Sequence, residues 1–499
     1  MKTYKIYSLI GFLTILSILG CKDEFLERSP QATLVAGNFP ATGEEAVIAT
    51  NGIYNTLRIW GIYSGGFPLI DIMTDEMVKG SNPGDGVQVL NFQDYTFTSD
   101  DGNIETWYRT LYLGIRRSYL VLEKVPEIEM DSQLQNRLLG EARFLRSFFY
   151  FSLVQAFGDV PLVESSEAPD GLERTNKEVI YQDIIFPDLL FAIDNLPEKS
   201  EYANEDAGRI TRGAARAMLA RIHLYRGEFS EAATYALEVI NSQQYGLEDE
   251  FQMAFRVATE HGQESVFEIG AVAENSFALG GNQYANTQGV RGTPNWGWGF
   301  GRPSYPWMEK LDNDNDPRLD GSVIFLGDVI DGVSIQGDGT TPDTTYAEDG
   351  TTILEIETYN RKVYATGERN ADRWGHNRRV IRYSDVLLMA AEALNETGNA
   401  SQALNYLNEV RQRARGDDDQ LLPDIATTDP NQLREIIYEE RSRELAFEGL
   451  RYWDLIRTDR AEEVLSPLGF EAGKHELFPI PQSEINISEG KISQNPNWN

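Results

Sequence analysis

The sequence predicts an all-α protein built from packed helix pairs, with long loop insertions and minor β hairpins between them. Apolar residues recur at the three- and four-residue spacing of an α-helix over 103–124 and again over 132–157. Hydrophobic residues make up 41% of the 499 residues, which is enough for a sizeable core and excludes a wholly disordered chain. The segment 270–375 lacks this periodicity and interrupts the helical pattern.

Residues 1–20 have the composition of a signal peptide. Two lysines precede an apolar run over 6–19, which is short for a membrane-spanning helix, and Gly20 stands directly before Cys21, the only cysteine of the chain. One cysteine cannot form an internal disulfide. Residues 21–40 have the composition of a tether, with recurring Pro and Gly. An ordinary signal peptide with a chance cysteine, or an uncleaved anchor, is the alternative interpretation.

Two larger regions follow the tether, an N-terminal helical region over 41–245 and a C-terminal region over 246–499 that includes the 270–375 insertion. In the first, Gly158 follows the 132–157 helix and is expected to end it. Thr211 has a side chain favoured at a helix N-cap, and an apolar face follows it.

Two segments, 214–241 and 385–414, share the pattern of a helix, a short turn and a second helix. When they are aligned on Gly227 and Gly398, alanines and a tyrosine coincide on both sides of the turn. Glycine can end the first helix, and small residues let two helices approach closely. Each segment resembles a tetratricopeptide unit, but the copies lie far apart, so we expect helix pairs within one α-rich body. Two unrelated helical hairpins are the alternative.

The insertion contains the best candidates for a ligand surface. Trp296, Trp298 and Trp307 lie within twelve residues, and glycines alternate through this run. Exposed aromatic rings stack on the apolar faces of sugars, while amides and carboxylates bond the hydroxyls. We therefore expect a carbohydrate-binding loop that includes Trp296, Trp298 and three flanking residues: Asn282, Tyr284 and Tyr305. The alternative is that one or more of these indoles anchor the loop to the core.

No pattern in the chain singles out a catalytic or metal centre. None of the four histidines is spaced as a ligand pair, and the motifs of serine hydrolases, zinc peptidases and phosphate loops are missing. The run 312–316 begins like a calcium loop, but Pro317 replaces the required glycine and Val323 stands at the twelfth position, which favours a polar turn. We expect no metal, no cofactor and no catalytic residue, although composition alone does not exclude a carboxylate pair of the glycosidase type.

The charge of the chain also limits its partners. Asp and Glu number 78 against 44 Lys and Arg, for a formal net charge of −34, so nucleic acid is an unfavourable partner. The segment 431–458 is predicted to form one highly charged helix, with Arg441 on an otherwise apolar face. A buried guanidinium needs a carboxylate, and Glu440, Glu444 and Glu448 are near, which favours a structural ion network over a catalytic role.

Several motifs occur in a characteristic order along the chain. They are NGIY at 51–54, GEARFLR at 140–146, FGDVPL at 157–162, RIT at 209–211, VIRYSDVLL at 380–388, ERSRELAFEG at 440–449, FPIP at 478–481 and QNPNW at 494–498. Together they resemble the SusD/RagB family, surface lipoproteins of bacterial glycan-uptake systems. The residues before Cys21 likewise resemble a lipoprotein cleavage box, in which the cysteine carries the lipid, and the acidic residues after it resemble a signal for the outer leaflet of the outer membrane.

The resemblance implies a tetratricopeptide-like fold, no catalysis, and a position on the cell surface in the outer membrane. It implies capture of an oligosaccharide or polysaccharide and delivery to a SusC-like TonB-dependent outer-membrane transporter. Sites in this family combine the loop after the first helices with the mid-chain insertion, which points to Asp75 and the loop 79–102. A peptide-binding or purely structural lid of the transporter is the alternative, and a surface glycoside hydrolase is a weaker one.

Overall fold

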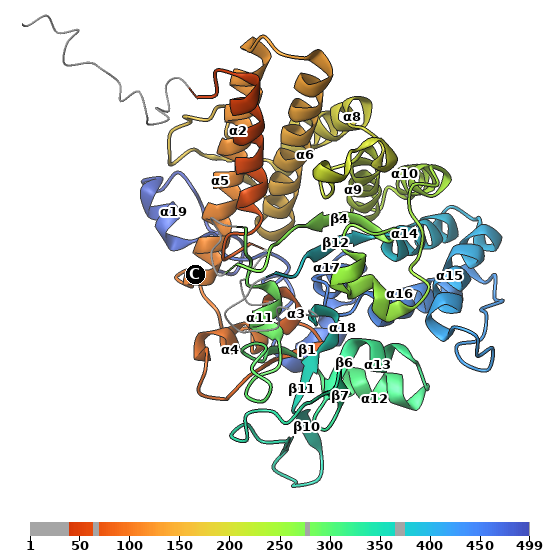
Figure 1. The fold of residues 1–499 in the computed structure, drawn as a ribbon. Helices are drawn as coiled ribbons and strands as arrows, with labels where there is room; N and C mark the ends of the chain where they lie inside the picture. Colours follow the sequence, from red (N-terminus) through yellow and green to blue (C-terminus); the bar gives the residue numbers. More distant parts are fainter. Residues whose placement is uncertain (1–38, 63–68, 275–279, 365–374, 499) are drawn as a thin grey trace, which may run out of the picture.

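The computed structural model describes residues 39–62, 69–274, 280–364 and 375–498. The predicted signal peptide, Cys21 and nearly all of the tether lie outside them. Within the described residues the all-α prediction is confirmed, because long helices form the body and the strands are short (Figure 1). The helices of this body are α2 (Gly43–Thr56), α5 (Gly102–Lys124), α6 (Ser132–Phe157), α8 (Phe186–Asn195), α9 (Arg212–Tyr225), α10 (Phe229–Asn241), α14 (Tyr383–Glu396) and α15 (Ala400–Arg415).

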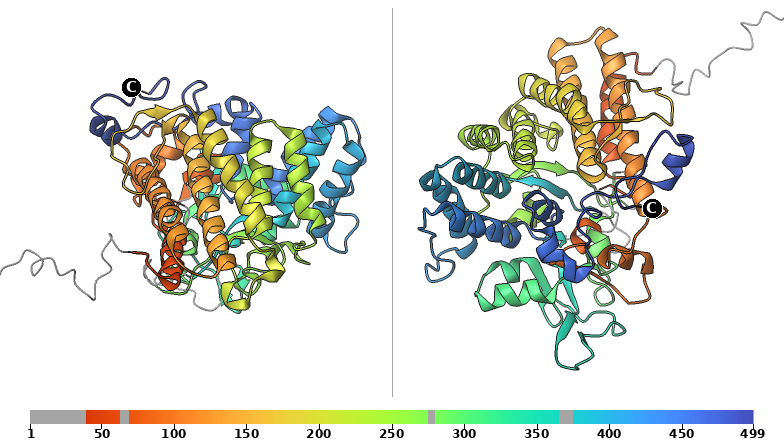
Figure 2. Two further views of the ribbon diagram at one scale, coloured as in Figure 1. Left: turned by 90° about the horizontal axis from the view of Figure 1, so that it is seen from above. Right: turned by 180° about the vertical axis from the view of Figure 1, so that it is seen from behind.

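These helices stack in chain order, each against its neighbours, from α2 to α15. Viewed from above they form a row of roughly parallel rods (Figure 2). The predicted helix pairs are α9 with α10 and α14 with α15, and α10 packs on α14, so the two similar segments become adjacent. None of the helices in the described ranges combines the length and the apolar character needed to cross a membrane.

Local sequence explains where these helices begin and end. The Thr211 hydroxyl accepts the amide of Ala214 at 3.0 Å, which confirms the predicted N-cap of α9. Gly227 (φ 72°) and Gly398 (φ 82°) follow α9 and α14 in the left-handed conformation that glycine adopts without strain. The two predicted turns are therefore glycine-terminated, as expected.

The remaining helices, most of them short, surround the stack or lie in the insertion. They are α3 (Leu69–Ile72), α4 (Val87–Gln93), α7 (Lys177–Ile180), α11 (Tyr284–Gln288), α12 (Tyr305–Asn313), α13 (Arg318–Ser322), α16 (Pro430–Leu445), α17 (Arg451–Arg457), α18 (Ala461–Leu465) and α19 (Gln482–Ile487). The insertion thus contains three helices that its sequence did not predict. Each spans nine residues or fewer, too short for a clear helical period.

The strands form two-stranded antiparallel sheets. They pair β1 (Met77–Gly80) with β5 (Phe300–Pro303), β2 (Val160–Pro161) with β3 (Arg174–Thr175), β4 (Ser265–Ile269) with β12 (Arg378–Arg382), β6 (Val323–Phe325) with β11 (Thr358–Asn360), β7 (Val329–Ile330) with β8 (Val333–Ser334), and β9 (Thr344–Tyr346) with β10 (Ile353–Ile356). The β4–β12 pair runs beneath the helices, and the other insertion strands lie at the opposite end of the molecule from α2 (Figure 1). The predicted minor hairpins are confirmed.

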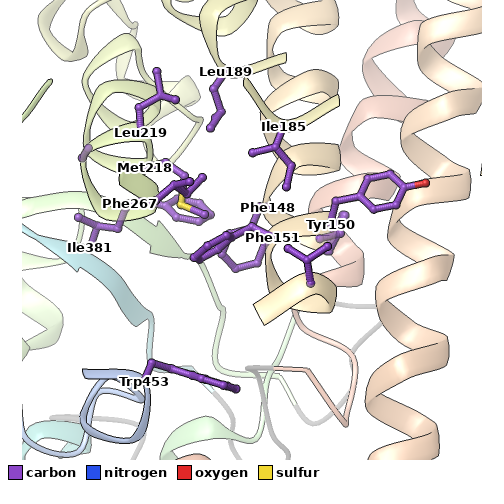
Figure 3. Packing of buried hydrophobic residues seen from close by; sticks show 14 of the residues in the cluster. Phe148, Tyr150, Phe151, Ile185, Leu189, Met218, Leu219, Phe267, Ile381 and Trp453 are labelled. Carbon is purple, nitrogen blue, oxygen red and sulfur yellow. The ribbon is translucent and has the colours of Figure 1, made fainter. Parts of the chain in front are cut away.

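The main core lies where the helices meet the β4–β12 pair (Figure 3). Phe148 on α6 points toward Phe267 on β4, with ring centroids 5.7 Å apart in an edge-to-face arrangement. Met218 on α9 and Ile381 on β12 close the same cluster and are at most 1% exposed. The strand pair thereby ties the insertion to the helical stack through apolar burial.

Helices α5 and α6 approach each other closely at Gly114. A Cβ atom built there would lie less than 3.0 Å from three ring atoms of the fully buried Phe149. We expect Gly114→Ala to lower the free energy of unfolding by about 1–3 kcal/mol, because the ring or the helix must move. Urea denaturation would measure the loss. Gly52→Ala on α2 is the control, since no atom lies within 4 Å of that Cβ position, and an equal loss in both variants would contradict the argument.

The prediction of one helix over 431–458 is wrong, because the chain turns between α16 and α17. The ammonium group of Lys362 donates to the backbone carbonyls of Glu444 (2.9 Å) and Ala446 (2.8 Å), which a continuing helix would use itself. Phe447 then adopts φ 67° and is buried. The contact with Lys362, which is distant in the sequence, therefore ends α16. The residues next to Glu444 do not predict that the helix ends there.

Arg441 is buried in an ion network, as expected, but with different partners. Its guanidinium bonds to Asp385 (2.9 Å) and Asp454 (2.8 Å). The glutamates expected to pair with it bind other cations: Glu440, Glu444 and Glu448. Both aspartates are within hydrogen-bond distance of further arginines, so the network serves packing and leaves no free base.

Candidate functional site

The β1–β5 pair brings two loops together that are far apart in the sequence. One is the loop 81–86, and the other is residues 289–299, here called the Trp loop. The amide of Ser81 donates to the Gly299 carbonyl at 2.6 Å, and the Ser81 hydroxyl donates to the Trp298 carbonyl at 2.8 Å. These bonds fix the backbone of Trp298 against the first loop.

The other side of the Trp loop rests on α11. The amide of Trp298 donates to the carbonyl of Asn286 at 2.7 Å. A Cβ atom at Gly297 would overlap that carbonyl, so only glycine permits the approach. Trp298 is half-buried, and its ring centroid lies 6.3 Å from that of Trp60, at an interplanar angle of 46°. Trp60, also half-buried, comes from the segment that follows α2.

A charged cluster stands beside this indole pair. The Arg291 guanidinium donates to Asp338 at 2.7 Å and to the Ser81 hydroxyl at 3.0 Å, and it also pairs with Asp85. Arg291 and Asp85 expose 29% and 42% of their side chains, so both can reach a ligand. The hydrogen bonds of the partly exposed Arg291 guanidinium thus connect the Trp loop to the loop 81–86 and to the segment that contains Asp338.

The protonation of Asp338 is fixed by its hydrogen bonds. Partial burial alone would raise the pKa of Asp338, but the amides of Thr341 and Thr340, at 2.7 and 2.8 Å, hold that pKa below its usual range. Asp338 is therefore an acceptor and not an acid at neutral pH. The site offers two indole rings, a guanidinium donor and carboxylate acceptors, which are the groups that bind the faces and hydroxyls of a neutral sugar.

The structure separates the other expected ligand residues from this pair. The ring of Trp296 lies 5.2 Å from that of Tyr364 and packs on a small apolar cluster, so it anchors the loop. Trp307 is 4% exposed and its indole nitrogen donates to the Ser442 carbonyl. Asn282 is fully buried, and its amide donates to the His376 carbonyl at 3.2 Å, so its side chain lies away from the surface.

Tyr284, Tyr305 and Asp75 remain partly exposed but lie in other surroundings. The guanidinium of Arg378 lies 5.2 Å from the ring of Tyr284, and burial raises the pKa of this tyrosine to about 12. Tyr305 begins α12, beyond strand β5 from Trp298. Asp75 forms two 2.9 Å bonds to Arg451. These contacts join the three side chains to residues other than the indole pair.

The loop 79–102 contributes to the site only through its first residues. The chain forms α4 there and buries its aromatic side chains in the main core: Phe92, Tyr95 and Phe97. Sequence reasoning missed Trp60, Arg291 and Asp338. The one available signal for Trp60 was an indole next to a glycine, Gly61.

The acidic run 312–316 folds as a polar turn bound to arginines. Asp316 pairs with Arg318 at 2.7 Å, and Asp314 pairs with Arg443 at 2.5 Å. Guanidinium groups therefore occupy the carboxylates that a calcium ion would need. Among the described residues no group of three or more metal-ligating side chains gathers elsewhere.

Two family models match this chain, and several known proteins are similar to it in sequence. The model of the SusD family matches residues 263–469, and a model described as starch-binding associating with outer membrane matches residues 72–224. SusD-like protein P2 of Formosa agariphila is 28% identical over 520 residues, covering 100% of both chains. A SusD-like protein of Bacteroides ovatus is 24% identical, covering 81% of this chain and 75% of its own.

Solved structures agree with the fold. A laminarin-binding SusD-like protein superposes with a TM-score of 0.75 at 26% identity, covering 92% of this chain and 100% of its own. Surface glycan-binding protein A from Bacteroides thetaiotaomicron, solved in complex with laminarihexaose, superposes with a TM-score of 0.73 at 24% identity, covering 91% and 100%. The second likeness supports the fold alone.

Proposed function

Because this chain belongs to the SusD/RagB family, we propose that it is a non-catalytic glycan-binding protein. The observation that carries the proposal is the pair of half-exposed indoles, Trp60 and Trp298, beside the Arg291 cluster. The protein would be held at the outer surface of the outer membrane by a lipid on Cys21. It would deliver the captured oligosaccharide to a SusC-like TonB-dependent transporter.

The geometry of the indole pair favours a bent glycan. Rings 6.3 Å apart and tilted by 46° cannot both lie flat on one planar ribbon, but they can follow successive sugar rings of a curved chain. Laminarin is the ligand in the name of the relative at 26% identity. A neutral glucan is also compatible with the net charge of −34, which repels polyanions. We therefore favour a neutral, laminarin-like glucan.

Asp338, one of the two carboxylates that bond to Arg291, is not suited to be the acid of a glycosidase. A glycosidase needs one carboxylic acid with a raised pKa beside a second carboxylate. Here Asp338 has a lowered pKa, and both Asp338 and Asp85 bond to Arg291. Asp338 therefore acts as a fixed hydrogen-bond acceptor.

We expect the double variant Trp60→Ala, Trp298→Ala to bind laminarihexaose at least about tenfold more weakly than wild type, because two stacking faces are lost. Isothermal titration calorimetry on the protein without its first 21 residues would measure the affinity. The control is Tyr346→Ala, which removes an aromatic ring that is 51% exposed on β9 and should leave binding unchanged.

Two outcomes would contradict the proposal in different ways. Full affinity in the double variant would show that the site lies elsewhere. Failure of the wild-type protein to bind laminarin, starch, xylan or mannan in affinity gels would contradict glycan binding itself. Sugar released into those gels would identify a hydrolase.

A further inference from the structure

A second cavity, lined by none of the segments that form the indole site, lies between α5 and the C-terminal segment. Its volume is 360 Å³, at the lower end of the range for small-ligand sites. Side chains of α5 form one wall, the loop 161–172 forms the second, and α19 with Ile492 forms the third. In Figure 1, α19 lies alongside α5 at the edge of the molecule.

Aromatic, aliphatic and charged side chains line this cavity. Tyr112, Leu172 and Ile492 are among the apolar ones. Tyr112 satisfies its hydroxyl by donating to the Pro161 carbonyl at 2.8 Å. The hydroxyl of Tyr108 is buried and closed to solvent, so a ligand in the cavity does not reach it.

Two ion pairs border the mouth. Arg109 bonds to Glu484 at 3.1 Å, and Arg116 bonds to Asp170 at 2.9 Å. Each pair offers N–H donors and carboxylate acceptors side by side, which is the arrangement that bonds a hydroxyl in both of its roles. Arg109 also pairs with Glu105, so the mouth has no excess positive charge to attract an anion.

We propose that this cavity is a second carbohydrate-binding site, which takes a single neutral sugar ring of a glycan. The apolar faces of the ring would contact Tyr112 and the aliphatic side chains, and its hydroxyls would bond to the two ion pairs. The volume excludes a long chain inside the cavity, so the site binds a chain end or a side branch.

The two sites would act together on a polymer. A glycan long enough to reach both would bind with an affinity above that of either site, because the second contact is intramolecular. The second site does not depend on the indole site. Its test therefore uses the Trp60→Ala, Trp298→Ala variant as background, in which the first site is removed.

Methyl NMR spectroscopy gives a readout confined to the cavity. Methyl β-glucopyranoside and laminarihexaose are added separately, at millimolar concentration, to protein with labelled Ile and Leu methyl groups. We expect saturable shifts at Leu113, Ile487 and Ile492, and none at Leu190, which is 46% exposed on α8 and does not line the cavity. Benzyl alcohol, added in parallel, serves as the probe for a purely apolar ligand.

Two variants make the assignment specific. Leu113→Trp fills the mouth, where Leu113 is 38% exposed, and should abolish the Ile487 and Ile492 shifts. Leu190→Trp is the matched control and should preserve them.

The proposal would be overturned by either of two results. One is the absence of cavity shifts with both sugars. The other is saturable shifts with benzyl alcohol but not with the sugars, which would identify an apolar pocket that takes a side chain of a partner. Loss of laminarihexaose binding at the indole site alone would leave the cavity shifts unchanged, so failure of one site is distinguishable from failure of the other.

Discussion

Replacing Glu444 by glutamine should lower the free energy of unfolding by about 3–5 kcal/mol, the range for removing one partner from a buried ion pair. Glu444 is fully buried, and its carboxylate bonds to Arg318 (3.3 Å), Arg382 (3.0 Å) and Arg413. Glutamine keeps the shape of the side chain but removes the negative charge. The guanidinium groups of Arg318, Arg382 and Arg413 would then lie close together without the negative charge of Glu444.

The three arginines belong to different parts of the fold. Arg318 lies on α13 in the insertion, Arg382 lies on β12, and Arg413 lies on α15 in the helical stack. Glu444 on α16 therefore holds the insertion, which carries the Trp loop, against the body. Its replacement should loosen this attachment before the helices unfold.

We also expect Glu444 to make part of the free energy of unfolding depend on pH in the acid range. Burial alone would raise the pKa of Glu444, but Arg413 and Arg382 lower it to about 2. Because the folded pKa is below the unfolded value of 4.5, this stabilisation is present above pH 4.5 and is lost as the pH falls toward 2. The Glu444→Gln variant should lose less stability than wild type across that window.

Urea denaturation followed by circular dichroism, at pH 7 and at pH 3, would measure both effects. Glu435→Gln on the same helix is the matched control, because Glu435 is 63% exposed and should change stability by less than about 0.5 kcal/mol. Equal losses in the two variants would show that the network around Glu444 does not stabilise the fold.

Much of the helical body could be predicted from the sequence because its signals are local. The periodic segments 103–124 and 132–157 correspond to α5 and α6 within one residue, and the cap at Thr211 and the turn glycines have the expected roles. A helix that packs in a stack repeats its apolar residues with a fixed period. The period therefore identifies the element before its neighbours are known.

The candidate site could not be predicted in the same way because its contacts are not local. Trp60 meets Trp298 only after β1 has paired with β5, and no period connects these segments. The sequence also could not distinguish the half-exposed Trp298 from the buried Trp307, since both lie in one aromatic run. The end of α16 also depends on a contact that is not local, because Lys362 of the insertion binds the carbonyl of Glu444.

A second large effect is expected at Glu76, where removing a charge should stabilise the protein. The side chain is 1% exposed; one carboxylate oxygen accepts the Ser442 hydroxyl at 2.6 Å, and the other makes no hydrogen bond. Burial raises the pKa of Glu76 to about 8, although Arg451, 3.7 Å away, opposes the shift.

The folded protein therefore retains a proton on Glu76 that the unfolded chain loses above pH 4.5. Because the folded pKa is the higher one, stability falls as the pH rises from 4.5 to about 8 and is level below that window. Glu76→Gln is neutral at every pH and should remove this decline. At pH 8 we expect the variant to be more stable than wild type by on the order of 3 kcal/mol.

Unfolding curves of wild type and Glu76→Gln at pH 5, 6, 7 and 8 would test this expectation. The two proteins should be similar near pH 5 and diverge with rising pH, while the exposed control Glu129→Gln should follow wild type throughout. Glu76 directly precedes β1, and its carbonyl accepts the Ser304 amide at 2.8 Å at the start of α12, so its charge acts on the strand pair that positions the Trp loop. A wild-type stability that stays level between pH 5 and 8 would mean that Glu76 is ionised in the folded protein and that Arg451 outweighs its burial.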